Sequence, residues 1–470
     1  MVSGSLTPLL LEHARVIEAE AKDHGLDFFE VIFEMLDARD VNAIAAYGGF
    51  PIRYPSWRFG MEYERLQKGY QYGLSKIYEL VINNDPTLAY LVRSNSLMEQ
   101  KLVMAHVFGH ADFFKHNVWF APTERNMIEI MSRHSERLRR DIDLHGQDRV
   151  ETFLDAALSL DSLVDPYLPL REHTRDSDES ASPVRHAERA RLSLERLLRS
   201  CSSETTGEPE PVPRVALPTY DVLGFLADNA PLEAWELDIV RTVRQEAYYF
   251  LPQRMTKIIN EGWASFWHSR ILTGGILEAS EVVEFADCHS GATATGPGQL
   301  NPYKLGIELF RHAEQTGRDI FRLRRVHNDV SFIDQIVDQE FAARNQLFLY
   351  ERNARTGRTE VSGRDWRAVK DQLLRELAWC GTPQIELVDD NENHSRELLF
   401  VHHHEGRDLK LDEASEMVKQ IAGIWKRPVH LLTLEEGQGR RLTAADGEVQ
   451  VVEAKRALEL CAGERPSKAG

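Results

Sequence analysis

The sequence predicts a mainly helical N-terminal body followed by a small α+β domain. Apolar residues recur at helical spacing through most of residues 1–375, whereas residues 376–470 contain short strand-like runs separated by polar turns. The chain has 470 residues, 42% of them hydrophobic, which is enough for two or three domains with a large core. We therefore expect a helical domain over 1–375 and an α+β domain over 376–470.

The expected helices of the N-terminal body are long and are separated by glycine or proline. Gly48-Gly49 interrupts the first pattern, Asp85-Pro86 marks a turn or a helix start, and Gly274-Gly275 ends the last long pattern. Residues 286–304 resemble a loop because they are rich in glycine and proline. The segments with helical periodicity are 5–40, 62–83, 96–120, 123–163 and 220–272.

Residues 171–214 differ in composition from the segments on either side. They are rich in Ser, Glu, Asp, Arg and Pro, and their hydrophobic content is low. Such a segment buries too little apolar surface to offset the entropy of ordering it. We expect an exposed, mobile insertion here.

The last hundred residues predict a small sheet with one helix. Residues 384–387 and 397–403 are strand-like, and the polar turn between them indicates a hairpin. Residues 411–425 have the apolar spacing of an amphipathic helix. Further strands are expected at 428–434 and 448–452. His402, His403 and His404 alternate between faces of the second strand and are expected at the surface.

Charge and cysteine content limit the classes of partner and compartment. The formal net charge of -18 disfavours binding to nucleic acid or to an anionic membrane. The four cysteines are far apart in the sequence, which is typical of a reducing compartment rather than of a disulfide scaffold. No signal peptide and no apolar run of membrane-spanning length is present, so a cytoplasmic protein is expected.

His106 and His110 form the pattern with the most chemical content. Two histidines four residues apart on a helix project from one face about 6 Å apart, which is close enough to share one divalent metal. Glu261 is the candidate third ligand, and zinc is the expected ion. Gly262 lies in an apolar helical pattern, where glycine destabilises a helix by about 1 kcal/mol relative to alanine. A glycine at such a position indicates close approach of another backbone. The alternative is two histidines whose nitrogens are satisfied by neighbouring polar groups or by water.

The pattern lacks the general base of the common zinc-hydrolase motif. In His-Glu-x-x-His the glutamate after the first histidine activates water, and here that position is Val107. Candidate catalytic residues elsewhere are Glu62, Glu246 and His268. Because His268 lies about 10.5 Å along a helix from Glu261, we expect it behind the ligands or in a substrate pocket. Asp112 and His289 are further candidates.

Six stretches together resemble the SpoVR family, the stage V sporulation protein R-like proteins. The stretches are residues 47–64, 73–86, 101–115, 246–253, 260–268 and 301–306. The resemblance implies a role in spore cortex formation, or in a stress response, since relatives occur in bacteria that do not sporulate. It also implies two partners, an AAA-type serine protein kinase and a von Willebrand A-like protein, which are often encoded nearby. Valine between the histidines is similar to the family's own pattern.

Two hypotheses of different classes follow. The first is a zincin-like metallohydrolase with a helical core that acts on an amide or peptide bond through His106, His110 and Glu261. The second is a non-catalytic regulatory or scaffold protein that works with the kinase and the von Willebrand A-like protein. The missing glutamate favours the second hypothesis, and the spacing of the ligands favours the first.

Overall fold

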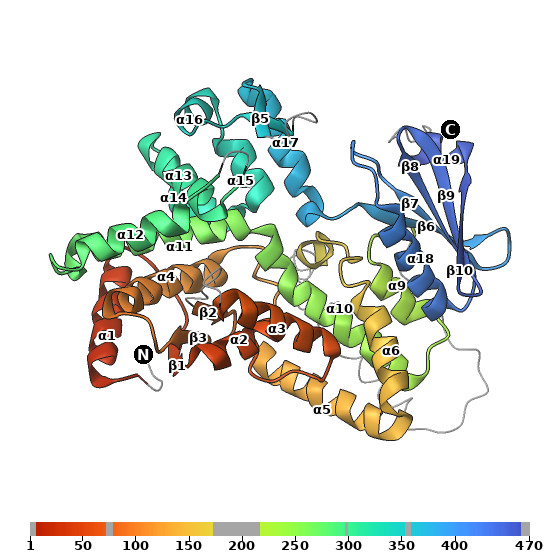
Figure 1. Cartoon of the computed structure of the whole chain (residues 1–470), viewed down its shortest axis with the longest axis horizontal. Helices are drawn as coiled ribbons and strands as arrows, with labels where there is room; N and C mark the ends of the chain where they lie inside the picture. The colour runs from red at the N-terminus through yellow and green to blue at the C-terminus, as the bar shows by residue number, and fades with distance from the viewer. Residues whose placement is uncertain (1–5, 72–78, 173–216, 297–298, 353–358, 462–470) are drawn as a thin grey trace, which may run out of the picture. The chain divides into compact units, whose positions relative to one another are not determined.

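The computed structural model describes residues 6–71, 79–172, 217–296, 299–352 and 359–461 (Figure 1). The chain is mainly helical with a β-rich C-terminal region, as the sequence predicts. It divides into two compact units. The first contains residues 1–151 and 249–381, and the second contains residues 152–248 and 382–470. The expected insertion at 171–214 lies almost entirely outside the described residues.

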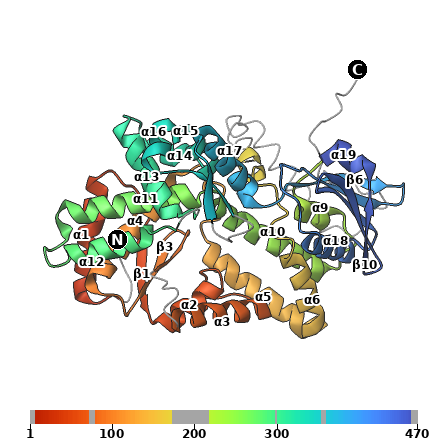
Figure 2. The same cartoon turned by 45° about the horizontal axis from the view of Figure 1, so that its top comes forward.

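Three helices form the centre of the first unit. They are α4 (Leu97–His116), α11 (Lys257–Ile271) and α13 (Pro302–Gln315). Helix α11 lies between α4 and α13 in both views (Figures 1 and 2). Ser96 begins α4 with a capping box to Glu99, and Asn301 accepts hydrogen bonds from the first turn of α13. Nearly every side chain of α4 is buried, so this helix is enclosed on all sides.

Glycine allows these helices to pack backbone against backbone. A Cβ added to Gly109 of α4 would lie 2.7 Å from the Cα of Ala264 in α11. A Cβ on Gly262 would lie 2.4 Å from the backbone of Gly306 in α13. The close approach expected from Gly262 is therefore confirmed. Because the backbones meet, residues beside these glycines on different helices are held at fixed separations.

Asp112 links three elements and is fully buried. Its Oδ1 accepts the backbone N–H of Asp27 at 2.9 Å, and its Oδ2 accepts the indole N–H of Trp263 at 2.8 Å. The guanidinium of Arg324 lies 3.1 Å from the same carboxylate. Burial raises the pKa of Asp112 to about 6, although Arg324 acts in the opposite direction. These contacts give Asp112 a structural role in holding α4 against α11.

A three-stranded sheet packs beside these helices, and the sequence prediction missed it. Its order is β1 (Val31–Leu36), β3 (Thr87–Val92) and β2 (Glu79–Ile82), with β1 parallel and β2 antiparallel to β3. The predicted helix over 5–40 is wrong beyond α1 (Pro8–Asp23), because Gly25 with a φ of 89° ends it. In β1 alternate residues are buried, which is the period of a strand.

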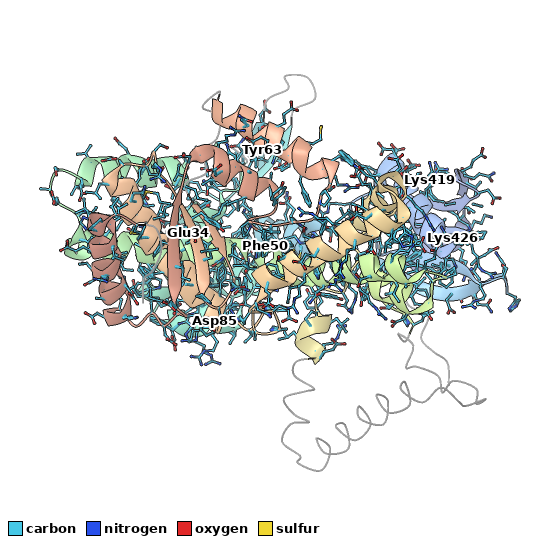
Figure 3. The ribbon with its side chains drawn as sticks, turned by 90° about the horizontal axis from the view of Figure 1, so that it is seen from below. Glu34, Phe50, Tyr63, Asp85, Lys419 and Lys426 are labelled. Atoms are coloured by element: carbon cyan, nitrogen blue, oxygen red, sulfur yellow. The ribbon has the colours of Figure 1, made fainter. Side chains whose placement is uncertain are left out.

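The turn at Gly48-Gly49 precedes an aromatic cluster. Both glycines have positive φ, 73° and 95°. Phe50, which is labelled in Figure 3, packs against the rings of Tyr249 and Phe250 at centroid distances of 5.5 and 5.9 Å. The guanidinium of Arg53 lies 4.6 Å from the ring centroid of Phe59. The segment is therefore fixed by aromatic contacts within itself and with residues 249–250.

The remaining helices of the first unit are mostly amphipathic. The loop expected over 286–304 is wrong up to residue 293, because α12 covers that part. Its residues after Phe285 are largely exposed, so no apolar periodicity revealed the helix. These helices are α2 (Ala38–Ala46), α3 (Trp57–Gln71), α5 (Met127–His145), α12 (Val282–Thr293), α14 (Ile320–Val326), α15 (Asp329–Ile336), α16 (Gln339–Arg344) and α17 (Trp366–Leu377). Helices α6 (Gln147–Leu158) and α10 (Ala234–Met255) contribute to both units.

The second unit contains a five-stranded sheet in the order β10-β9-β8-β7-β6. The predicted hairpin is confirmed as the antiparallel pair β6 and β7, and the predicted helix is confirmed as α18. Helix α18 connects β7 to β8, which run parallel. Strand β9 was missed because its sequence is largely polar. The elements are α9 (Val222–Asn229), β6 (Ile385–Glu392), β7 (Glu397–His402), α18 (Leu411–Trp425), β8 (Val429–Glu435), β9 (Gln438–Ala445), β10 (Glu448–Glu453) and α19 (Lys455–Cys461).

The surface placement expected for the histidine run is wrong for His402. Its side chain is buried, and its Nδ1 lies 2.9 Å from the hydroxyl of Thr433. Burial lowers the pKa of His402 to about 4, so this imidazole is neutral. His403 and His404 instead meet the carboxylates of Glu386 and Asp408, each at 2.7 Å. Separate partners for each ring argue against a shared metal here.

Candidate metal centre

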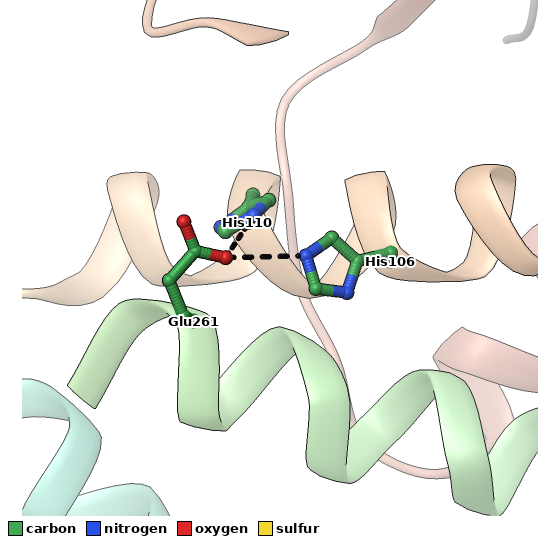
Figure 4. Close-up of side chains that lie close together, drawn as sticks. All are labelled: His106, His110 and Glu261. Carbon is green, nitrogen blue, oxygen red and sulfur yellow. Dashed lines mark ion pairs between the residues drawn. The ribbon is translucent and has the colours of Figure 1, made fainter. Parts of the chain in front are cut away.

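His106, His110 and Glu261 converge between α4 and α11 (Figure 4). The two histidines project from one face of α4 and are buried, while Glu261 projects from the first half of α11. One ligand-type atom from each residue lies within 4.8 Å of the others. The helix crossing at Gly109 and Ala264 sets this arrangement, because it places the two helix backbones in direct contact. Residues 155 positions apart in the sequence thus face one another.

The separations within the group match those of atoms that share a metal. Oε2 of Glu261 lies 3.4 Å from Nε2 of His106 and 3.5 Å from Nε2 of His110. A hydrogen bond between a charged imidazole and a carboxylate is shorter, about 2.7–2.9 Å. Two ligands bound at about 2.0–2.1 Å to a tetrahedral zinc ion lie about 3.3–3.4 Å apart. The residues present therefore fit a divalent ion better than a direct ion pair.

Asn260 sets the orientation of the His110 ring. Its Oδ1 lies 2.9 Å from Nδ1 of His110, and a carbonyl oxygen can only accept a hydrogen bond. Nδ1 of His110 therefore carries the proton in the neutral ring, and the lone pair of Nε2 faces Glu261. Metal-binding histidines usually donate their other nitrogen to an oxygen in this way. The sequence analysis assigned no role to Asn260, although it directly precedes Glu261.

A chain of imidazoles extends from His106. Nδ1 of His106 lies 2.9 Å from Nδ1 of His268, and Nε2 of His268 lies 3.1 Å from Nδ1 of His289. Burial keeps the pKa of His268 well below its usual value, so this ring is neutral. Both hydrogen bonds form if Nδ1–H of His106 donates to Nδ1 of His268, and Nε2–H of His268 donates to Nδ1 of His289. Nε2 of His106 then presents its lone pair to Glu261.

Electrostatics and packing both hold the group in its ionised, oriented form. Burial by itself raises the pKa of Glu261, but hydrogen bonds and positive charge from His106 and His110, when their Nε2 atoms are protonated, outweigh it and leave that pKa well below its usual value. A bound metal ion would take the place of these protons, and the Nε2 lone pairs would then face the ion. The ring of Tyr303 stacks beside His106 at a centroid distance of 6.1 Å. The ring of Phe114 stacks beside His110 at 6.0 Å. Glu261 is therefore a carboxylate at neutral pH, as a metal ligand must be.

The other residues predicted for catalysis lie in different environments. Glu62 forms a bidentate pair with Arg65 at 2.6 and 2.8 Å, and this hydrogen bond lowers the pKa of Glu62. Glu246 is buried in α10, in the second unit. His268 lies on the Nδ1 side of His106, behind the nitrogen that faces Glu261. Catalytic roles for these three residues stay predictions.

Comparison with protein families shows which family the chain belongs to. A family model described as "SpoVR like protein" matches residues 6–382. This chain belongs to the SpoVR family. The match contains all three residues of the candidate metal centre and ends at the start of the C-terminal segment of the second unit.

One curated relative resembles the chain over nearly its whole length. It is "Uncharacterized protein YcgB" of Escherichia coli (strain K12), which is 27% identical over 487 residues. The aligned region covers 93% of this chain and 92% of the relative. No solved structure matches. Among the described helices of this SpoVR protein, none is long and apolar enough to cross a bilayer.

Replacing Asn260 with alanine tests the role assigned to its side chain. We expect Asn260→Ala to weaken zinc binding about 10–100-fold, because the Nδ1 proton of His110 loses its acceptor. Asn260→Asp is the matched control, since a carboxylate also accepts this hydrogen bond and should retain the affinity. Competition with a chromophoric chelator measures both dissociation constants. Equal affinities for the alanine variant and the parent protein would show that Asn260 does not orient His110.

Proposed function

We propose that this SpoVR protein binds one divalent metal ion through His106, His110 and Glu261, and that zinc is its ion. The observation that carries the proposal is the pair of nitrogen–oxygen separations, 3.4 and 3.5 Å, on a single carboxylate oxygen. Two imidazoles and one carboxylate are a ligand set that zinc favours. Asn260 and His268 support the proposal because they direct both Nε2 lone pairs toward Glu261.

The activity we propose is hydrolysis of an amide or peptide bond. Three protein ligands are the number found in catalytic zinc sites, which keep a further position for water or substrate. When bound, such an ion polarises a carbonyl and lowers the pKa of its water. The Glu261 side chain is 16% exposed, whereas its Oε2, which faces the histidines, is buried. Two histidines four apart on one helix and a glutamate on another are similar to the zincin arrangement.

A second candidate is a non-catalytic site. Val107 is fully buried in α4 at the position where the common zinc-hydrolase motif has its general base. A bound ion would then fasten α4 to α11 without turnover. In this proposal the protein is a regulatory or scaffold component that works with an AAA-type serine protein kinase and a von Willebrand A-like protein. For both candidates we propose a cytoplasmic setting in sporulation or in a stress response.

A single experiment separates the two candidates. The purified protein is loaded with zinc and incubated with a quenched-fluorescent peptide library, in parallel with Glu261→Gln and with an EDTA-treated sample. The hydrolase predicts turnover that the parent protein shows and that both the variant and EDTA abolish. Glu261→Gln is close in shape to the parent, so loss of turnover with an unchanged circular dichroism spectrum reports on chemistry. Stoichiometric zinc without turnover would favour the non-catalytic candidate.

A further inference from the structure

A pocket of about 240 Å³ lies in the first unit beside the first turn of α13. Its walls come from residues 295–296, 299–301 and 304–305, from residues 345–350 up to the start of β4 (Leu349–Arg352), and from α17. The floor is apolar and includes Leu305, Leu347, Val369 and Leu373. It is smaller than the roughly 300–1,000 Å³ that a whole drug-sized ligand occupies. The pocket is therefore suited to one part of a longer ligand.

Four carboxamide side chains line the pocket together with these apolar residues. Gln299, Asn345, Gln346 and Gln372 all line the pocket. The amide nitrogen of Gln372 donates to Glu376 at 2.7 Å, and that of Asn345 donates to the carbonyl of Phe341 at 3.1 Å. Both carbonyl oxygens keep the capacity to accept a hydrogen bond from a ligand. Carboxamides carry both donors and acceptors, which match the alternating N–H and C=O groups of a peptide backbone.

Gln346 occupies a backbone position that favours glycine. It directly follows Asn345, the C-cap residue of α16, and has a φ of 51°. The N–H of Gln346 donates to the carbonyl of Ala343, and the N–H of Leu347 donates to the carbonyl of Ala342. Helices that end in this way usually have glycine at this position, because a Cβ is strained there. Glutamine is less favourable than glycine for folding at this position, and its carboxamide lines the pocket. The Gln346 side chain is therefore held at the pocket by a backbone position that is strained for any residue other than glycine.

Strand β4 provides an edge for an extended ligand. It pairs with β5 (Thr359–Gly363) in a two-stranded sheet, so within the described residues its other edge pairs with no strand. Leu349 and Tyr350 of β4 line the pocket. A peptide that lies along such an edge places alternate side chains on one face, where one of them can enter an apolar pocket.

We propose that this pocket binds an extended peptide, with an apolar side chain on the leucine-rich floor and the backbone against the carboxamides. The first turn of α13 connects the pocket to the candidate metal centre. Asn301 and Lys304 line the pocket, and Tyr303 between them stacks beside His106. A role of the pocket as a substrate site rests on the proposed amide hydrolysis. Binding of a peptide to the pocket does not depend on that proposal.

Fluorescence anisotropy with a defined probe tests the proposal. The probe is a pool of fluorescein-labelled hexapeptides with a central leucine and randomised flanks, and a pool with N-methylated backbones is the control. We expect saturable binding of the first pool only. Gln346→Gly should weaken binding about three- to tenfold while raising the melting temperature, since it removes hydrogen-bonding groups and relieves the backbone. A purely structural glutamine would not show these opposite effects.

Pocket-blocking variants complete the test. Gln372→Trp, which fills the pocket, should abolish binding, and Asp371→Trp is the matched control at an exposed neighbouring position of α17 that does not line the pocket. His110→Ala should bind the probe as the parent does while failing to bind zinc, so failure of the metal site is distinguished from failure of the peptide site. Equal binding by Gln372→Trp and the parent, or no saturable binding at all, would overturn the proposal.

Discussion

We expect His110→Ala to reduce the zinc content of the purified protein from about one ion per chain to nearly zero. The substitution removes one of three ligands, which should weaken binding by more than the roughly 10–100-fold loss typical of residues behind the ligands. The stability of the parent protein should also depend on zinc. An ion present at about 1,000 times its dissociation constant adds about 4 kcal/mol to the free energy of unfolding.

The control for this prediction is His116→Ala. His116 lies on the same helix, but its Nε2 lies 3.1 Å from Asp27, and among the residues that the structure describes it belongs to no metal-ligand group. Metal analysis by mass spectrometry should give the same zinc content for His116→Ala as for the parent protein. Thermal unfolding should show the same rise in melting temperature when zinc is added. Equal zinc content in His110→Ala and the parent would eliminate the metal site and the hydrolase proposed from it.

Gly262→Ala should destabilise the first unit strongly, by about 3 kcal/mol or more. The new methyl group would lie 2.4 Å from the Cα and carbonyl carbon of Gly306, and a backbone cannot rotate away as a flexible side chain can. Helices α11 and α13 must therefore separate. Because Glu261 directly precedes Gly262, zinc affinity should fall together with stability.

Gly423→Ala is the matched control for this substitution. Gly423 lies on an exposed part of α18, and an added Cβ there meets nothing within 4 Å. Alanine should stabilise that helix by about 0.5–1 kcal/mol, because glycine loses more backbone entropy on folding. Urea unfolding followed by circular dichroism measures both variants. A similar small effect at both positions would contradict the close crossing of α11 and α13.

Local sequence patterns predicted the long buried helices well. The Ser96 capping box and the high apolar content of residues 102–114 define α4, and the amphipathic spacing of residues 411–425 defines α18. Predictions failed where pairing with a distant strand decides the structure, as in β1, and where exposed or polar residues leave no apolar period, as in α12 and β9. Strand β1 continues from an apolar helical pattern, and its identity depends on pairing with β3, whose partner residues lie 56 positions later.

For the candidate metal centre too, local spacing predicted one part and tertiary contacts decided the other. Spacing alone places His106 and His110 on one helix face, because a helix turn fixes their separation. The direction of each ring depends on Asn260 and His268, which reach the histidines only because Gly109 lets α11 pack against α4. No local pattern encodes a contact between residues 150 positions apart.

The sequence by itself determined the mainly helical body, the β-rich C-terminal region, the SpoVR relationship and the three ligand-type residues, since each depends on short-range spacing or on continuous motifs. Only the tertiary structure decided that the carboxylate oxygen of Glu261 lies between two imidazole nitrogens at 3.4 and 3.5 Å. Such a meeting is set by helix packing over long sequence separations, where backbone contact at glycine fixes positions that periodicity cannot specify.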